Sequence, residues 1–280
     1  MTSATPRANG WLRAPQATGA SDHACWSYSS EVERAKAATR WLRTGLRHGQ
    51  QALYVADAPV DALIAELAEL PDPQSAIDAG ALLVFSTADL YDVSTPISAE
   101  AQLATYASVV EQATADGYNG LRVAADITPL VREPSRRDAH VYWEQVADRW
   151  MTEHPLAPLC MYDTRELTGV EAIACVHPLQ GPRSPQFALY ADGSTEAALW
   201  GELDAFVADA FANALARLPE TDTALDLTRL SFIDGRATWI LHNELARRRT
   251  AGRPLVVSGV SPLLRKLWRM CDFDPALLAT

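Results

Sequence analysis

Three near-continuous apolar runs, separated by stretches with helical periodicity, constrain the fold of this chain more than any other feature. Leu53–Val55, Leu82–Phe85 and Leu121–Ala125 lack the regular alternation of apolar and polar residues that a half-exposed strand shows. Runs of this kind are typical of strands that are covered on both faces in a parallel sheet. We therefore expect an α/β fold whose strands alternate with helices.

The length of 280 residues suggests two domains, at roughly 100–200 residues for each. In the first domain, Ser30 and Glu33 form a capping-box pattern, which predicts that a helix begins there. The other elements expected in this domain are strands at 24–28, 51–56, 81–86, 120–125, 159–162 and 172–176, and helices at 60–70, 99–115, 138–154 and 165–169.

Proline and glycine mark the domain limits. Residues 1–20 have little periodicity and predict a flexible N-terminal arm, and Gly181, Pro182 and Pro185 predict a linker at 181–186. The first domain then covers residues 21–180, and a smaller α/β domain covers 187–280. For the second domain we expect strands at 187–190, 223–227 and 254–258, and helices at 195–218, 236–249 and 261–271.

Composition excludes several classes of function. The net charge is −11, which offers no overall positive field for nucleic acid or an anionic membrane. There is no apolar stretch of membrane-spanning length and no signal-peptide core, so we expect a cytoplasmic protein. The four cysteines include no CxxC pair, which argues against a disulfide scaffold or a zinc ribbon.

In open parallel sheets, ligands gather at the carboxyl ends of the strands. His23 and Cys25 lie two residues apart and should project from one face of their strand, as should Cys160 and Tyr162. The residues at the expected strand ends are Tyr28, Asp57, Ser86, Thr87, Asp126, Tyr162, Asp163 and His177.

This group of thiols, imidazoles and phenols has two interpretations. Imidazole and thiolate are preferred ligands of soft metals, so the group could be a metal or reactive-thiol site. Isolated cysteines are more often small core residues, and we favour that interpretation. We therefore expect neither a metal nor a cofactor.

A family resemblance covers about residues 21–180. The segments His23-Ala-Cys25-Trp-Ser-Tyr28, Leu159-Cys160-Met-Tyr162-Asp163 and Val176-His177-Pro178 resemble the MEDS sensory domain. The resemblance implies a ligand-sensing relative of the RecA-like ATPase fold without a working phosphate loop. It also implies that one small-molecule pocket is formed by His23, Cys25, Tyr28, Tyr162 and His177.

The second domain resembles a STAS domain, the fold of anti-anti-sigma factors, over about residues 187–273. The resemblance rests on Ala224-Leu-Asp-Leu-Thr-Arg-Leu-Ser-Phe-Ile-Asp234 followed by a helix, and on the later strand and helix from Leu255. It implies contacts with an anti-sigma factor, a kinase or another protein of a STAS assembly. The implied docking residues are Asp234, Gly235, Arg236 and Thr238.

Phosphoregulated STAS domains carry Ser or Thr directly after the aspartate, whereas Gly235 follows Asp234 here. Asp234 can simply cap the helix, or it can take part in docking, and the sequence leaves both roles open. Ser231 and Thr238 are the nearest hydroxyls, and neither restores the pattern. Whether either is phosphorylated stays open.

The preferred interpretation is a non-enzymatic signalling protein. Its first domain senses a small ligand, and its second domain transmits the signal through protein contacts in anti-sigma and sigma factor control. One alternative is an enzyme that uses the His/Cys/Tyr cluster, which would need His177 within hydrogen-bond reach of Cys25 or Asp163. Another is a scaffold for oligomers, and self-association stays open.

We predict that the first domain does not hydrolyse ATP, because the Tyr28–Glu31 turn has neither the glycines nor the lysine of a phosphate cradle. In a phosphate-release assay with magnesium, the full chain should match a heat-inactivated control. Turnover above that control, abolished by Asp126→Ala, would refute the prediction.

Overall fold

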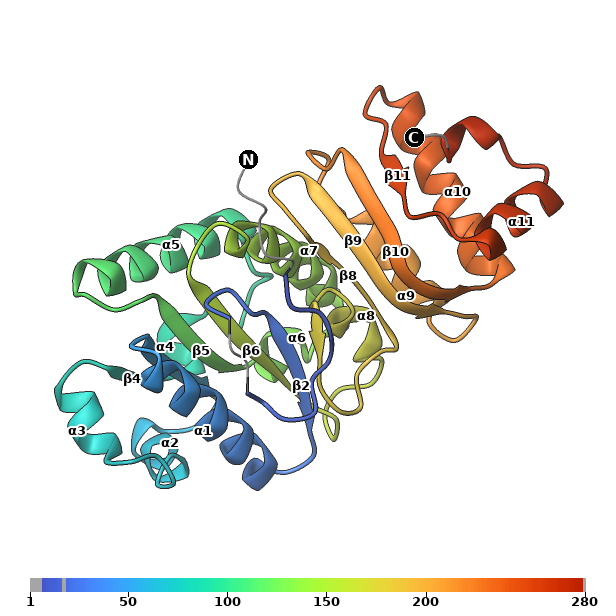
Figure 1. Ribbon diagram of the computed structural model, residues 1–280. Coiled ribbons are helices and arrows are strands. Elements are labelled where there is room, and N and C mark those ends of the chain that lie inside the picture. Colours follow the sequence, from blue (N-terminus) through green and yellow to red (C-terminus); the bar gives the residue numbers. More distant parts are fainter. Residues whose placement is uncertain (1–6, 17–18, 279–280) are drawn as a thin grey trace.

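Parallel pairing of buried strands builds the larger of two sheets in this computed structural model, which describes residues 7–16 and 19–278 (Figure 1). All the paired strands of this sheet run parallel. Its strand order is β1 (Gly10–Trp11), β7 (Leu179–Gln180), β2 (Ala24–Tyr28), β6 (Leu156–Asp163), β5 (Leu121–Asp126), β3 (Gln51–Ala56) and β4 (Leu82–Ser86). The expected parallel α/β architecture of the first domain is confirmed.

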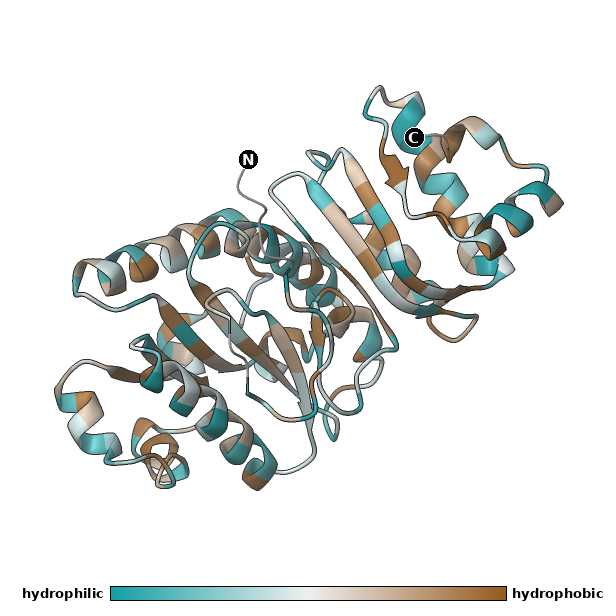
Figure 2. Ribbon diagram, viewed as in Figure 1, coloured by the Kyte–Doolittle hydropathy of each residue, from teal (hydrophilic) through white to brown (hydrophobic). Residues whose placement is uncertain are grey.

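Helices cover both faces of this sheet, and each carries bands of hydrophilic and hydrophobic residues (Figure 2). Trp41 and Leu42 of α1 (Glu31–Arg47) pack on one face together with Leu63 of α2 (Val60–Glu66). The other face is covered by α5 (Ala99–Ala115) and α7 (Pro134–Met151). The shorter helices are α3 (Pro73–Asp78), α4 (Thr87–Leu90), α6 (Thr128–Val131) and α8 (Glu171–Ala174).

The second sheet is mixed and has four strands. Its order is β11 (Val256–Ser258), β10 (Ala224–Ile233), β9 (Glu196–Leu203) and β8 (Phe187–Ala191), and only the β8–β9 pair is antiparallel. Its helices are α9 (Ala208–Ala216), α10 (Gly235–Thr250) and α11 (Pro262–Met270), followed by the short 3-10 helix η1 (Pro275–Leu277).

The two sheets share one apolar core, which runs from the α7 side of the first sheet to the inner side of the second. Phe187, Leu189 and Phe211 belong to the same buried cluster as Val141 of α7 and Ile173 of α8. Hydrogen bonds cross the junction from Leu189 N to Cys175 O at 2.8 Å, from Gln145 Nε2 to Ala214 O at 2.9 Å and from Trp200 Nε1 to Pro178 O at 2.9 Å.

The N-terminal arm differs from the expectation of flexibility where it is described. Gly10 and Trp11 form β1 on the edge of the first sheet, and the Trp11 ring packs edge-on against Trp200 at 5.7 Å between centroids. These contacts connect the segment to both sheets. Residues 1–6 and 17–18 of the expected arm lie outside the described residues.

Three expected elements are wrong. Residues 172–176, expected as a strand, lie largely in helix α8, and the expected helix at 165–169 is a turn region. Short buried apolar runs have no periodicity that separates helix from strand. Residues 195–218, expected as one helix, form β9 and then α9. Alanine-rich β9 is held by pairing with β8 and β10, which overrides its helix propensity.

The expected linker at 181–186 runs along β2, where Gly181 N donates to Cys25 O at 3.0 Å and Arg183 donates to Ser27 O at 3.1 Å. Within the described ranges, no helix combines the length and the apolar character needed to cross a bilayer.

A buried ion pair at the junction should contribute more to stability than an exposed pair of the same length. Arg149 lies 2.6 Å from Asp222, with side chains 13% and 0% exposed, and Arg249 lies 2.6 Å from Asp274, with side chains 48% and 44% exposed. Because Arg149→Met leaves a buried carboxylate unpaired, we expect it to lower the free energy of unfolding by about 3 kcal/mol. Arg249→Met should cost about 1 kcal/mol or less.

Urea unfolding of the full-length variants measures both values. Equal losses for Arg149→Met and Arg249→Met would contradict the assigned importance of the junction.

Candidate functional site

A cluster of buried polar side chains lies between the first sheet and helix α7. Strands β2 and β6 pair with Cys25 opposite Cys160, and both thiols point to the face that α7 covers. Helix α7 presents His140, Glu144 and Asp148, each four residues after the last, toward the sheet. At this spacing, side chains line one face of a helix.

Four side chains form what we call the His–Glu–Cys centre: His23, Glu144, Cys160 and His177. They are between 0% and 4% exposed, and one donor atom from each lies within 4.8 Å of the others. Glu144 Oε2 is 3.1 Å from His23 Nε2 and 3.6 Å from His177 Nε2. Cys160 Sγ is 3.7 Å from both His23 Nε2 and Glu144 Oε1.

The outward-facing nitrogens of both imidazoles are held by neighbouring groups. His23 Nδ1 is 2.8 Å from Asp148 Oδ1, and His177 Nδ1 is 2.9 Å from Ala174 O at the end of α8. Since a carbonyl oxygen only accepts, His177 must carry its proton on Nδ1. The Nε2 atom of each ring therefore points into the centre.

The environment sets opposite charge preferences for the two histidines. Burial, together with the charge of the neighbouring His23, lowers the pKa of His177 to about 3, so His177 is neutral. Burial also disfavours a charged His23, but the hydrogen bonds that it donates to the Asp148 and Glu144 carboxylates outweigh this effect and raise the pKa of His23. Burial would raise the pKa of Glu144, yet the adjacent His140 and the other imidazoles hold it well below its usual value.

Two further residues of the expected pocket border the centre. The Tyr162 ring meets the His177 ring edge-on at 6.0 Å, and the buried Tyr162 hydroxyl has no hydrogen-bond partner among the described residues. Cys25 Sγ donates to Gln180 Oε1 at 2.8 Å and lies 3.1 Å from Ser184 Oγ. Burial raises the pKa of Cys25 to about 12, which keeps it a thiol.

Tyr28 does not join this group. It lies an odd number of residues after Cys25, so its side chain points to the opposite face of the sheet, under α1. There Tyr28 OH donates to Asp126 Oδ2 at 2.8 Å, and Arg34 pairs with both Asp126 and Glu66. The structure thus brings His23, Cys25, Tyr162 and His177 together and leaves Tyr28 in a separate ion-pair network.

The centre also lies away from the strand ends where we expected ligands. His177 follows α8 and precedes β7, whereas the expected strand would have ended at it. Glu144 and Asp148 were missed altogether. The signal for them was the His140-x-x-x-Glu144-x-x-x-Asp148 spacing on an otherwise apolar helix face, because charged residues are seldom buried without a partner.

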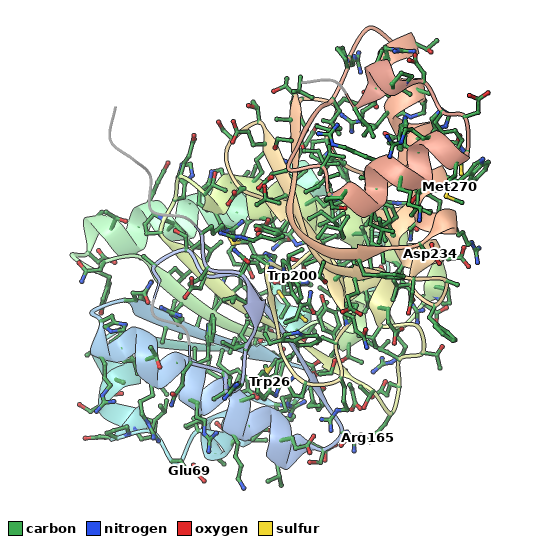
Figure 3. All side chains as sticks on the ribbon, turned by 45° about the vertical axis from the view of Figure 1, so that its right-hand side comes forward. Trp26, Glu69, Arg165, Trp200, Asp234 and Met270 are labelled. Atoms are coloured by element: carbon green, nitrogen blue, oxygen red, sulfur yellow. The ribbon has the colours of Figure 1, made fainter. Side chains whose placement is uncertain are left out.

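The expected docking residues lie at the start of α10, directly after the end of β10, where Figure 3 labels Asp234. Asp234 Oδ1 accepts from Ala237 N at 2.8 Å, which is a helix cap. Gly235 and Arg236 are exposed, but Thr238 is 0% exposed and its hydroxyl donates to Asp234 O. Of the two candidate hydroxyls, Ser231 alone is exposed.

A side chain at Gly235 would meet no atom within 4 Å of its Cβ, and the φ of Gly235 is not positive. The missing hydroxyl at this position is therefore not required by packing.

Comparison with known protein families finds two matches. Residues 22–178 match the family described as MEDS, the MEthanogen/methylotroph, DcmR Sensory domain. Residues 191–279 match the family described as Mlab, STAS domain. No curated protein matches the chain.

Proposed function

This chain belongs to the MEDS family of sensory domains and carries a STAS domain after it, and on that premise we propose that it is a ligand-controlled switch. In this proposal a small molecule changes the state of the His–Glu–Cys centre, and the STAS domain passes the change to a protein partner. The partner is an anti-sigma factor or another protein of a STAS assembly, so the outcome is control of a sigma factor. No catalytic step is required.

The observation that carries the proposal is the position of Asp148. Its Oδ1 lies 2.8 Å from His23 Nδ1, and its Oδ2 accepts from Ala191 N, the last residue of β8, at 2.7 Å. One buried carboxylate therefore contacts both the His–Glu–Cys centre and the second sheet. A change in the position or charge of His23 must alter the hydrogen bonding at the end of β8, because a buried carboxylate cannot turn to water.

The output surface is the start of α10. Trp239 of α10, Phe232 of β10 and Phe206 of the β9–α9 loop are 57%, 42% and 96% exposed. Asp234 N donates to Leu203 O, which joins the start of α10 to the end of β9. Exposed aromatic residues are enriched where proteins dock. With Gly235 in place of an acceptor hydroxyl, the switch works through conformation, and phosphate plays no part.

The enzymatic alternative is less well supported. His177 Nε2 has no hydrogen-bond partner within the described part of the chain, and Asp163 pairs with Arg165. Because the pKa of Cys25 is raised to about 12, this thiol is not an activated nucleophile at neutral pH.

We expect full-length protein to bind an anti-sigma factor from its own genome through the α10 start, and to lose that binding in Arg236→Glu. Arg40→Glu, an equivalent change on an exposed arginine of α1, should bind as wild type. Asp148→Asn removes the negative charge of the carboxylate that His23 and Ala191 N both contact. It should change the affinity for the anti-sigma factor by about 5–150-fold. Biolayer interferometry measures all four proteins.

The full chain is used because its two sheets share one core. Thermal unfolding of each variant shows whether it is folded. Wild-type affinity in folded Asp148→Asn would refute the switch, and wild-type affinity in Arg236→Glu would refute the docking surface.

A further inference from the structure

We propose that His23, Glu144, Cys160 and His177 bind one divalent transition-metal ion of the zinc class through four protein ligands. This reverses the expectation drawn from the isolated cysteines. The proposal goes beyond the switch function, because it names an ion that the centre would hold whether or not the STAS domain has a partner.

The spacing of the donor atoms fits a tetrahedral ion. Bonds of about 2.0–2.1 Å to nitrogen or oxygen and about 2.3 Å to sulfur require edges of about 3.3–3.6 Å between ligand atoms. The distances from Glu144 Oε2 are 3.1 Å to His23 and 3.6 Å to His177, and Cys160 Sγ is 3.7 Å from His23 Nε2. These three distances are within a few tenths of an ångström of such edges. Cys160 Sγ lies 3.9 Å from Glu144 Oε2, and the remaining donor pairs lie within 4.8 Å, so they would have to approach by up to about 1 Å on binding.

The orientation of the imidazoles is that of metal ligands. A histidine that binds a metal through one nitrogen donates its other N–H to a carboxylate or a backbone carbonyl. His23 has Asp148 in that position at 2.8 Å, and His177 has Ala174 O at 2.9 Å. Glu144 is supported by His140, whose Nε2 is 3.0 Å from Glu144 Oε1.

One donor atom in the centre has no partner. His177 Nε2 is fully buried and makes no hydrogen bond with any described residue, while its ring lies 4.2 Å from the His23 ring between centroids. A buried polar atom without a partner requires an explanation, and a bound ion is one of the common ones. A donor atom from each of the three other residues lies within 4.8 Å of this imidazole nitrogen.

Charge balance favours the same assignment. Metal binding requires the thiolate of Cys160, whose proton is released to solvent. The thiolate and the Glu144 carboxylate together carry two negative charges, which a divalent ion neutralises. Without the ion, this buried volume would enclose several ionisable groups with incomplete hydrogen bonding, which is costly in a region closed to water.

The donor set selects the type of metal. Two imidazoles with one thiolate and one carboxylate suit zinc, and a hard ion such as magnesium prefers oxygen ligands. Cys25 lies beside the centre but is not among its ligands, because its thiol already donates to Gln180. Four protein ligands leave no open position, which is typical of a structural ion.

Metal content of the full-length protein tests the proposal. We expect an equimolar amount of zinc in protein purified without chelators from zinc-supplemented cells, measured by elemental analysis. Apo protein loaded with cobalt should show the intense visible bands of a tetrahedral ion and a thiolate-to-cobalt charge-transfer band. These readouts are independent of any partner, so they can fail or succeed separately from the proposed switch.

Two serine variants locate the ligand. Cys160→Ser should lose the charge-transfer band, whereas Cys25→Ser, the matched control on the neighbouring strand, should keep it. Asp148→Asn should retain the ligands but bind zinc about 10–100-fold more weakly, because His23 loses its charged support. If Cys160→Ser does not fold, X-ray absorption of the wild-type zinc protein should still show one sulfur among its ligands.

Substoichiometric zinc together with no saturable cobalt uptake by apo wild type would overturn the proposal. So would a charge-transfer band that is lost in Cys25→Ser and kept in Cys160→Ser, or a zinc absorption spectrum without a sulfur ligand.

Discussion

The rest of this structure depends on the buried carboxylate of Asp148. It accepts hydrogen bonds from Arg7 at 2.7 Å, His23 at 2.8 Å and Ala191 N at 2.7 Å, which come from the N-terminal segment, the first sheet and the second sheet. Burial alone would raise its pKa, but Arg7 and His23 reverse this effect and hold the pKa at about 2. A charge with no access to water keeps all its partners in place, because losing any of them costs more than an ordinary hydrogen bond.

The two parts of the chain pack against each other through a shared core. Helices α7 and α8 of the first domain belong to a core that continues into β8 and α9. The buried Arg149–Asp222 pair lies at the same junction. The second sheet thus packs against the first domain through α7, the helix that carries Glu144 and Asp148. Helix α7 is in direct contact with β8, since Ala191 N donates to Asp148 Oδ2 at 2.7 Å.

Patterning predicted much of the fold but less of the site. The 99–115 helix and the strands around Leu53, Leu121 and Phe187 were readable from apolar runs and helical periodicity, whereas 172–176 and 195–218 were not, because pairing and packing decided them. The alternation of side chains along a strand predicted that Cys25 and Cys160 could share a pocket. The resemblance to the MEDS family predicted that His23 and His177 share one. Glu144 and Asp148 come from a helix whose position over β2 and β6 is a tertiary property. Tyr28 was assigned to the wrong face, since the resemblance gives positions along the chain without their direction.

In the proposed switch, the His–Glu–Cys centre and the second sheet are coupled through Asp148. Hydrogen–deuterium exchange of full-length His23→Gln tests it most directly, because this variant removes the Nδ1 contact to Asp148 and leaves the STAS sequence unchanged. Glu33→Gln, at an exposed position on α1, is the control. We expect faster exchange in β8 and at the start of α10 in His23→Gln alone. Exchange that changes only near residue 23, with β8 and α10 as in wild type, would contradict it.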